Sequence, residues 1–122
     1  MEQASPFSLL MTSVDTRQAA DLIIARALDL KLAACVQVAA IESHYVWEGE
    51  RTSAPELMLT MKIKSADYEA LATAIRDVHP YDTPEILRLD IAEGDSRYLD
   101  WLRAVTDKRI AADSGAWKAG GR

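Results

Sequence analysis

The sequence of 122 residues has a single cysteine, few glycines and prolines, no long apolar run and no basic cluster. One cysteine excludes a disulfide within the chain and fits a reducing compartment, so we expect a cytoplasmic protein. The apolar runs fall well short of the roughly 20 residues that span a bilayer, and residues 1–3 lack the basic character of a secretory signal. A net charge of −5 without clustered lysine and arginine argues against nucleic acid or an anionic membrane as a partner.

The sequence also lacks the short motifs that mark common enzyme classes. It has no glycine-rich phosphate loop, no H-E-x-x-H or C-x-x-C motif and no serine elbow. We therefore predict that the protein is not an enzyme of the hydrolase, kinase or dehydrogenase type. With 49% apolar and 27% charged residues, the chain is typical of one soluble globular domain. A small ligand, a cation or another copy of the chain remains as a partner.

The central feature of the sequence is residues 32–47, which contain neither glycine nor proline and many β-branched and aromatic residues. This pattern predicts one strand of about 50 Å, at about 3.3 Å per residue. A compact chain of this length has a radius of gyration of only about 14 Å. A straight strand would therefore extend beyond its own domain, so we expect it to bend or to lie partly on another subunit. Gly49 then permits a tight reversal, and alternating residues from Leu57 to Ile63 predict a returning strand.

The remaining periodicities complete the order of elements. Residues 7–14 predict a strand, and a helix that Asp15 caps follows to about Leu30; its apolar stripe includes Ile23, Ala27 and Leu28. After the hairpin we expect a helix capped by Ser65, a fourth strand over residues 87–91, and a helix from Asp95.

A βαββαβ chain of this kind predicts an α+β, ferredoxin-like sandwich with a long hairpin between its second and third strands and a C-terminal helix. Its two main helices cover one face of a four-stranded antiparallel sheet, so the other face favours a symmetric oligomer. We assign residues 1–106 to this single domain and residues 107–122 to a C-terminal tail.

Four separated motifs, in order and register over about residues 7–104, resemble the CutA family of divalent-cation tolerance proteins. The motifs are residues 32–36 (LAACV), 43–49 (SHYVWEG), 79–81 with 84–86 (HPY and PEI), and Gly94 with 98–102 (YLDWL). The resemblance implies a ferredoxin-like subunit in a tight homotrimer whose long hairpins are shared between neighbouring sheets. It also implies a link to tolerance of copper and other divalent cations, and an architecture related to that of the PII signalling proteins.

Two residues are candidate metal ligands. Some members of the family bind copper through a cysteine in the first strand and two histidines before the proline; here these positions are Thr12, Val78 and His79, so only His79 is retained. The thiol of Cys35 is the soft donor that copper prefers, although a cysteine between Ala34 and Val36 also fits a small buried apolar residue. The imidazole of His79 equally fits a side chain that satisfies carbonyl groups at the end of a helix.

A second group of residues offers flat aromatic surfaces and isolated charges, as ligand pockets often do. The alternatives are that the aromatic residues anchor neighbouring subunits and that the charged residues form an ion pair at an interface. The predicted pocket residues are Tyr45, Trp47, Lys62, Tyr81, Glu85 and Trp101.

These patterns favour a homotrimeric, cytoplasmic protein that binds copper or another divalent cation and acts by sequestration or sensing. The alternative is a PII-like signalling trimer that holds a small anion near Lys62 in clefts between subunits and meets a partner protein with its hairpin tips. An enzyme that uses Lys62, Tyr81 and Glu85 as acid and base groups is the least favoured hypothesis.

Overall fold

The computed structural model describes residues 4–110. Residues 111–122, which make up most of the predicted tail, lie outside the described residues. Within the described part, no helix is long and apolar enough to cross a membrane. The elements are β1 (Phe7–Val14), α1 (Arg17–Asp29), β2 (Cys35–Trp47), β3 (Glu50–Lys64), a 3₁₀ turn (Ser65–Asp67), α2 (Tyr68–Arg76), β4 (Ile86–Asp90) and α3 (Ser96–Val105).

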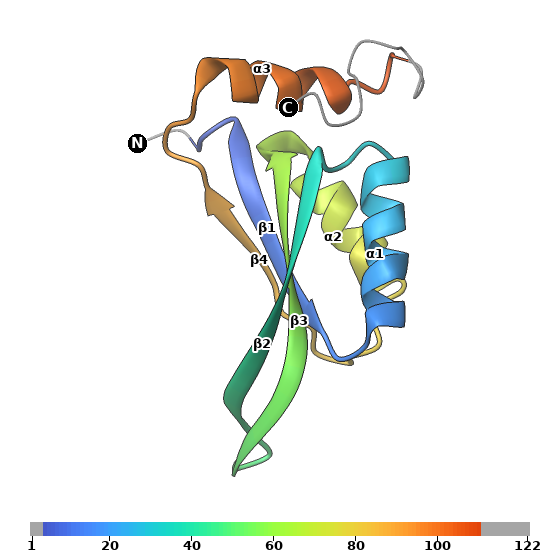
Figure 1. Cartoon of the computed structure of the whole chain (residues 1–122), viewed down its shortest axis with the longest axis vertical. Coiled ribbons are helices and arrows are strands. Elements are labelled where there is room, and N and C mark those ends of the chain that lie inside the picture. The colour runs from blue at the N-terminus through green and yellow to red at the C-terminus, as the bar shows by residue number, and fades with distance from the viewer. Residues whose placement is uncertain (1–3, 111–122) are drawn as a thin grey trace.

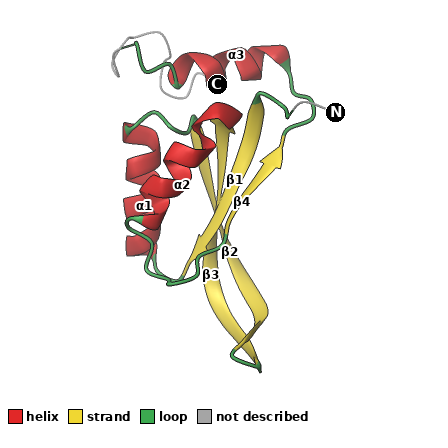
Figure 2. Ribbon diagram, turned by 180° about the vertical axis from the view of Figure 1, so that it is seen from behind, coloured by secondary structure: helices red, strands yellow, loops and turns green. Residues whose placement is uncertain are grey.

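The strands form one antiparallel four-stranded sheet in the order β2-β3-β1-β4. Helices α1 and α2 pack on the same face of this sheet, and α3 lies across the end of the sheet opposite the hairpin tip (Figures 1 and 2). This arrangement confirms the predicted α+β, ferredoxin-like fold. None of the helices among residues 4–110 covers the opposite face of the sheet (Figures 1 and 2).

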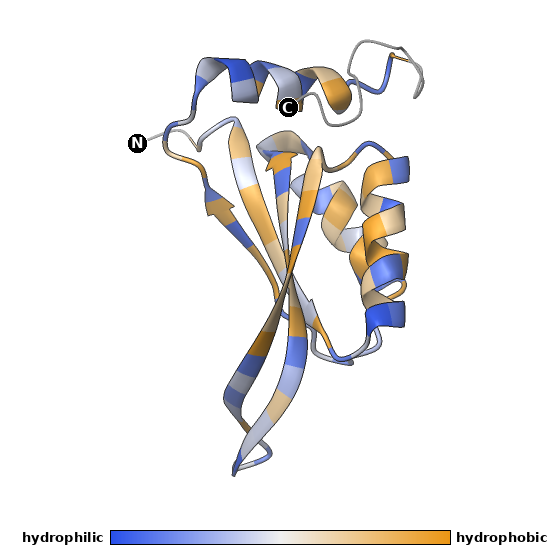
Figure 3. Ribbon diagram, in the orientation of Figure 1, coloured by the Kyte–Doolittle hydropathy of each residue, from blue (hydrophilic) through white to orange (hydrophobic). Residues whose placement is uncertain are grey.

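The core lies between the sheet and the two helices on its covered face. Apolar residues alternate along the C-terminal half of β3, so that Leu59, Met61 and Ile63 are fully buried. Fully burying one such side chain stabilises a fold by about 1.5–3 kcal/mol. Helix α1 contributes Ile23 and α2 contributes Leu71 to the same cluster, and apolar segments of the helices and the sheet face each other there in Figure 3.

The hairpin of β2 and β3 extends well beyond the rest of the sheet (Figure 1). Strand β1 pairs with β3 only as far as Val14 opposite Leu57, whereas β2 continues to pair with β3 as far as Trp47 opposite Glu50. Among the strands that the structure describes, the first part of β3 is therefore paired with β2 alone. Pro55 lies in this part of β3. Proline, which has no backbone N–H to donate, is tolerated in a strand that has one unpaired edge.

The turn at the hairpin tip has positive φ at both central residues, 51° at Glu48 and 80° at Gly49. Positive φ at both positions defines the turn that matches the twist of paired strands. The sequence indicated this conformation for Gly49 but not for Glu48.

Three local predictions were wrong. The N-cap of α1 is Thr16, whose Oγ1 accepts the N–H of Ala19 at 3.1 Å, and not Asp15. Ser65 does not cap α2, because its hydroxyl donates to the carbonyl of Ser5 and a 3₁₀ turn precedes the helix. Leu28, predicted on the buried stripe of α1, is 41% exposed.

The open face of the sheet carries apolar side chains that no element of the described chain covers. On β4, Leu87 is 51% exposed and Leu89 is 45% exposed. Leu9 and Met11 of β1, which are the register partners of Leu89 and Leu87, are only partly buried. The result is an apolar surface over β1 and the edge strand β4, as expected for a face that packs against another layer.

Candidate functional site

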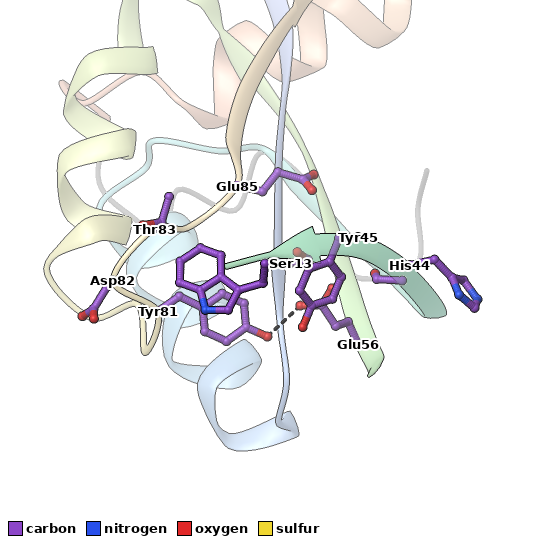
Figure 4. Close-up of a pocket in the computed structure, with 10 residues that line it drawn as sticks. Ser13, His44, Tyr45, Glu56, Tyr81, Asp82, Thr83 and Glu85 are labelled. Atoms are coloured by element: carbon purple, nitrogen blue, oxygen red, sulfur yellow. Dashed lines mark hydrogen bonds between the residues drawn. The ribbon is translucent and has the colours of Figure 1, made fainter. Parts of the chain in front are cut away.

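A cleft of about 620 Å³ lies at the base of the hairpin. It is formed where the C-terminal end of β1, the projecting part of β2 and β3, and the loop between α2 and β4 come together (Figure 4). The residues that line it are Ser13, Ser43, His44, Tyr45, Trp47, Glu56, Tyr81, Asp82, Thr83 and Glu85.

His79 fixes the loop after α2 against the end of β1. One ring nitrogen, Nε2, lies 2.9 Å from the carbonyl oxygen of Ser13, and the other, Nδ1, lies 3.1 Å from the backbone nitrogen of Tyr81. A carbonyl only accepts and a backbone N–H only donates, so this pairing requires a neutral ring with its proton on Nε2. Burial lowers the pKa of His79, and the hydrogen bond to Ser13 opposes that shift only in part. The neutral ring is therefore the form that suits the fold.

Tyr81 extends from this loop into the middle of the cleft (Figure 4). Its hydroxyl donates to Oε2 of Glu56 at 2.6 Å, and its ring meets the ring of His79 edge-on at 4.9 Å between centroids. Burial raises the pKa of Tyr81, and the hydrogen bond to Glu56 raises it further. Tyr81 thus stays protonated and holds one oxygen of the Glu56 carboxylate in place.

Glu85 brings a second carboxylate into the same cleft. Burial raises the pKa of Glu85, and the negative charge of Glu56 adds to this effect. Within residues 4–110 the Glu85 carboxylate has neither a hydrogen-bond partner nor an ion-pair partner. Asp82 adds a third carboxylate, and none of the described lining residues is lysine or arginine. The cleft is therefore negatively charged and favours a cation.

Four of the six predicted pocket residues meet in this cleft, namely Tyr45, Trp47, Tyr81 and Glu85. The other two are elsewhere in the chain. The ammonium group of Lys62 contacts the side-chain oxygen of Gln37 on β2, and Lys62 lies six positions from Glu56 along β3, about 20 Å at 3.3 Å per residue. Trp101 is on α3, where its ring lies 5.3 Å from that of Tyr98.

Several lining residues were not predicted from the sequence: Ser13, Ser43, His44, Glu56, Asp82 and Thr83. The most important of these is Glu56, because it accepts the hydrogen bond of Tyr81 and interacts with Glu85. Its place in an alternating strand indicated only an open-face side chain. Nothing near it in sequence identified Tyr81, which is 25 residues further on, as its partner.

The two predicted metal ligands lie at different positions along the strands of the sheet. Cys35 is half-buried opposite Lys62 of β3, while His79 binds Ser13, which is opposite Met58. Four residues along a strand correspond to about 13 Å, too far for both side chains of one chain to bind the same ion. A metal at His79 would also have to replace one of its two hydrogen bonds. No group of three or more histidine, cysteine or acidic side chains among residues 4–110 is placed to hold a metal ion.

The fold and the cleft together define a class: a ferredoxin-like α+β domain with a projecting hairpin and an acidic, aromatic-lined cleft at its base. Comparison with known proteins identifies the family. The CutA1 divalent ion tolerance protein family model matches residues 8–105, so the chain belongs to this family.

Individual relatives agree with this assignment. The divalent-cation tolerance protein CutA of Thermus thermophilus is 36% identical over 99 residues, which cover 80% of this chain and 96% of the relative. The chloroplastic CutA of Arabidopsis thaliana is 36% identical over 110 residues, covering 87% of this chain and 60% of the relative. The solved structure of the periplasmic divalent cation tolerance protein CutA from Archaeoglobus fulgidus superposes with a TM-score of 0.81 at 29% identity, and covers 83% of this chain and 99% of that one. The protein is thus a divalent-cation tolerance protein of the CutA family, and the family name refers to tolerance and not to a reaction.

Proposed function

We propose that the protein binds a divalent cation at the cleft, through the carboxylates of Glu56 and Glu85. The observation that carries this proposal is their convergence: two carboxylates share one partly buried cleft, and the charge of Glu56 contributes to the raised pKa of Glu85. A bound cation relieves that repulsion, because it neutralises both groups at once. The family name, which refers to divalent cations, supports the same chemistry.

The donors of the cleft are oxygen atoms, from carboxylates and from the hydroxyls of serine, threonine and tyrosine. Oxygen donors suit manganese, magnesium and calcium, but copper heads the affinity order of divalent first-row ions at almost any site and remains the foremost candidate. Two carboxylates leave several coordination positions for water or for a neighbouring copy of the chain.

We propose that the functional unit is a homotrimer. The exposed Leu87 and Leu89 of the open face and the unpaired side of the projecting part of β3 support association with further copies. The family resemblance supplies the number three. Such an assembly in the cytoplasm would act by sequestering or sensing the cation, and not by turnover.

The PII-like alternative, with a small anion as the ligand, receives less support. An anion in the cleft would face the carboxylates of Glu56, Asp82 and Glu85, while Lys62 lies outside it. The exposed hairpin tip, where Val46 is 73% exposed, keeps a partner protein as a second candidate ligand.

Calorimetric titration with Cu²⁺ and with Mn²⁺ tests the proposal. Glu85→Gln removes a charge at constant volume, so we expect roughly tenfold weaker binding or worse. Glu69→Gln, on the exposed side of α2, is the matched control and should bind like the wild type. Cys35→Ser and His79→Ala separate the alternative ligands. Unchanged isotherms for both Glu56→Gln and Glu85→Gln would overturn the proposal.

A further inference from the structure

The size of the cleft exceeds what a metal ion needs. Its volume of about 620 Å³ lies within the usual range of small-molecule sites, whereas one water takes up about 30 Å³. Small-molecule sites also combine apolar or aromatic walls with a few polar groups that fix orientation. The cleft has this composition, since Tyr45, Trp47 and Tyr81 supply aromatic surface beside the carboxylates.

The charges of the cleft determine which molecule fits it. Glu56, Asp82 and Glu85 are the acidic groups among the described lining residues, and none of those residues carries a fixed positive charge. The Glu85 carboxylate has no donor within residues 4–110 to satisfy its oxygens. A half-buried carboxylate in that state is satisfied best by a charged N–H donor.

The hydrogen bond from Tyr81 to Glu56 adds direction to the site. It occupies Oε2 of Glu56 and leaves Oε1 as an acceptor in the cleft that Tyr45 and Tyr81 also line (Figure 4). A ligand cation placed there would lie near aromatic faces as well as near a carboxylate. Cations are attracted to the faces of aromatic rings, those of tyrosine included.

We propose that this cleft binds a protonated organic amine with an aromatic or apolar body. Its ammonium group donates to Glu85 and to Oε1 of Glu56, and its body lies against Tyr45 and Trp47. This ligand goes beyond the divalent cation proposed above and does not require it. Because both ligands use Glu85, the amine and the metal ion compete.

A set of three probes of similar shape tests the charge requirement in the full chain, with a chelator present to remove metal ions. The probes are 2-phenylethylamine, the neutral 2-phenylethanol and the anionic 3-phenylpropionate. Binding by calorimetry should follow that order, with the alcohol roughly tenfold weaker than the amine or worse, and the acid not bound. No binding of the amine, or equal binding of amine and alcohol, would overturn the proposal.

Two variants locate the site. Glu85→Gln should lose the amine selectivity, and Trp47→Ala should weaken amine and alcohol alike, because Trp47 contributes surface and not charge. Trp47 is 52% exposed, so its replacement should leave the fold intact. Glu69→Gln should bind all three probes like the wild type. Amine binding that survives both cleft variants would place the ligand elsewhere and contradict the proposal.

Adding Mn²⁺ distinguishes this inference from the metal proposal. Weaker amine binding in the presence of Mn²⁺ supports a shared site. If Mn²⁺ fails to bind while the amine binds without it, the metal proposal fails and the amine proposal stands.

Discussion

The two halves of the β2–β3 hairpin are built from one continuous pair of strands, yet they differ in what surrounds them. In the half that ends at Lys64, β3 is covered by helices and pairs with β1, and Leu59, Met61 and Ile63 are fully buried. In the projecting half, Tyr45, Val46 and Trp47 are exposed, and among the described strands β3 is paired with β2 alone. The first half is stabilised by the core of its own chain. The second contributes little to the core and carries five of the ten residues that line the cleft.

The largest change in the free energy of unfolding is expected from a cavity in the covered half of the hairpin. Leu59→Ala should lower the free energy of unfolding by about 2–5 kcal/mol, since Leu59 is fully buried in the core. Val46→Ala, in the projecting half, should change it by less than about 0.5 kcal/mol. Urea denaturation at one fixed protein concentration measures both. Equal losses would show that the projecting half is packed as tightly as the core.

The next test concerns the open face of the sheet. Leu89→Glu places a charge in the proposed contact between copies, so we expect the assembly to dissociate to single chains. Light scattering coupled to size-exclusion chromatography measures the mass, and circular dichroism verifies that the chain stays folded. Leu22→Glu, at a leucine of α1 that is 49% exposed, is the control and should leave the mass unchanged. A folded single chain in the wild type would contradict the homotrimer.

His79 connects the end of β1 to the loop that lines the cleft. Its replacement should therefore lower the free energy of unfolding by an intermediate amount. His79→Ala removes the hydrogen bonds to Ser13 and Tyr81, each worth about 0.5–1.5 kcal/mol. The pKa of His79 is lowered in the fold from 6.5, so the unfolded chain takes up the proton first as the pH falls. This contribution to stability is full above pH 6.5 and is lost as the pH falls toward the folded pKa.

Urea denaturation of wild type and His79→Ala between pH 5 and pH 8 checks this sign. The stability difference between the two should shrink as the pH falls below 6.5. The other histidine, His44, is present in both proteins and cancels in the difference. Parallel curves for the two proteins would show that His79 titrates normally in the fold.

The smallest effect on stability is expected from Glu85. Its pH dependence is opposite to that of His79. The pKa of Glu85 is raised in the fold above 4.5, so wild type loses stability as the pH rises from 4.5 through the folded pKa. Gln does not titrate, so Glu85→Gln should melt at a slightly higher temperature than wild type at pH 7 and not at pH 4. Thermal scans in a chelating buffer measure this difference, and Glu69→Gln should show none. A lower melting temperature for Glu85→Gln at pH 7 would mean that the carboxylate stabilises the fold.

The sequence predicted the fold well because its signal is periodic. The alternation of Leu59, Met61 and Ile63 corresponds to β3, and β1 has the predicted bounds. The run to Trp47 corresponds to β2, although this strand begins at Cys35 and not at residue 32. Helix ends were predicted less well. Asp15 and Thr16 are both competent caps, and Ser65 could not be recognised as a partner of Ser5 from their positions 60 residues apart.

Part of the candidate site could also be predicted, from residues that stand out in the sequence around them. Aromatic residues and charges that stand out locally, such as Trp47 and Glu85, were found, and they line the cleft. Glu56 was missed because its importance comes from Tyr81 and Glu85, which the topology brings to it from another loop. A glutamate on an open strand face has no local feature that distinguishes it from a solvated one.

The most direct test of the central claim is to map the cation on the protein by NMR. Small amounts of Mn²⁺ added to the ¹⁵N-labelled full chain broaden the signals of nearby amides. The account predicts that broadening is centred on Glu56, Tyr81 and Glu85 and is absent around Cys35 and Trp101. Broadening centred on Cys35, or spread evenly over the acidic surface, would contradict it.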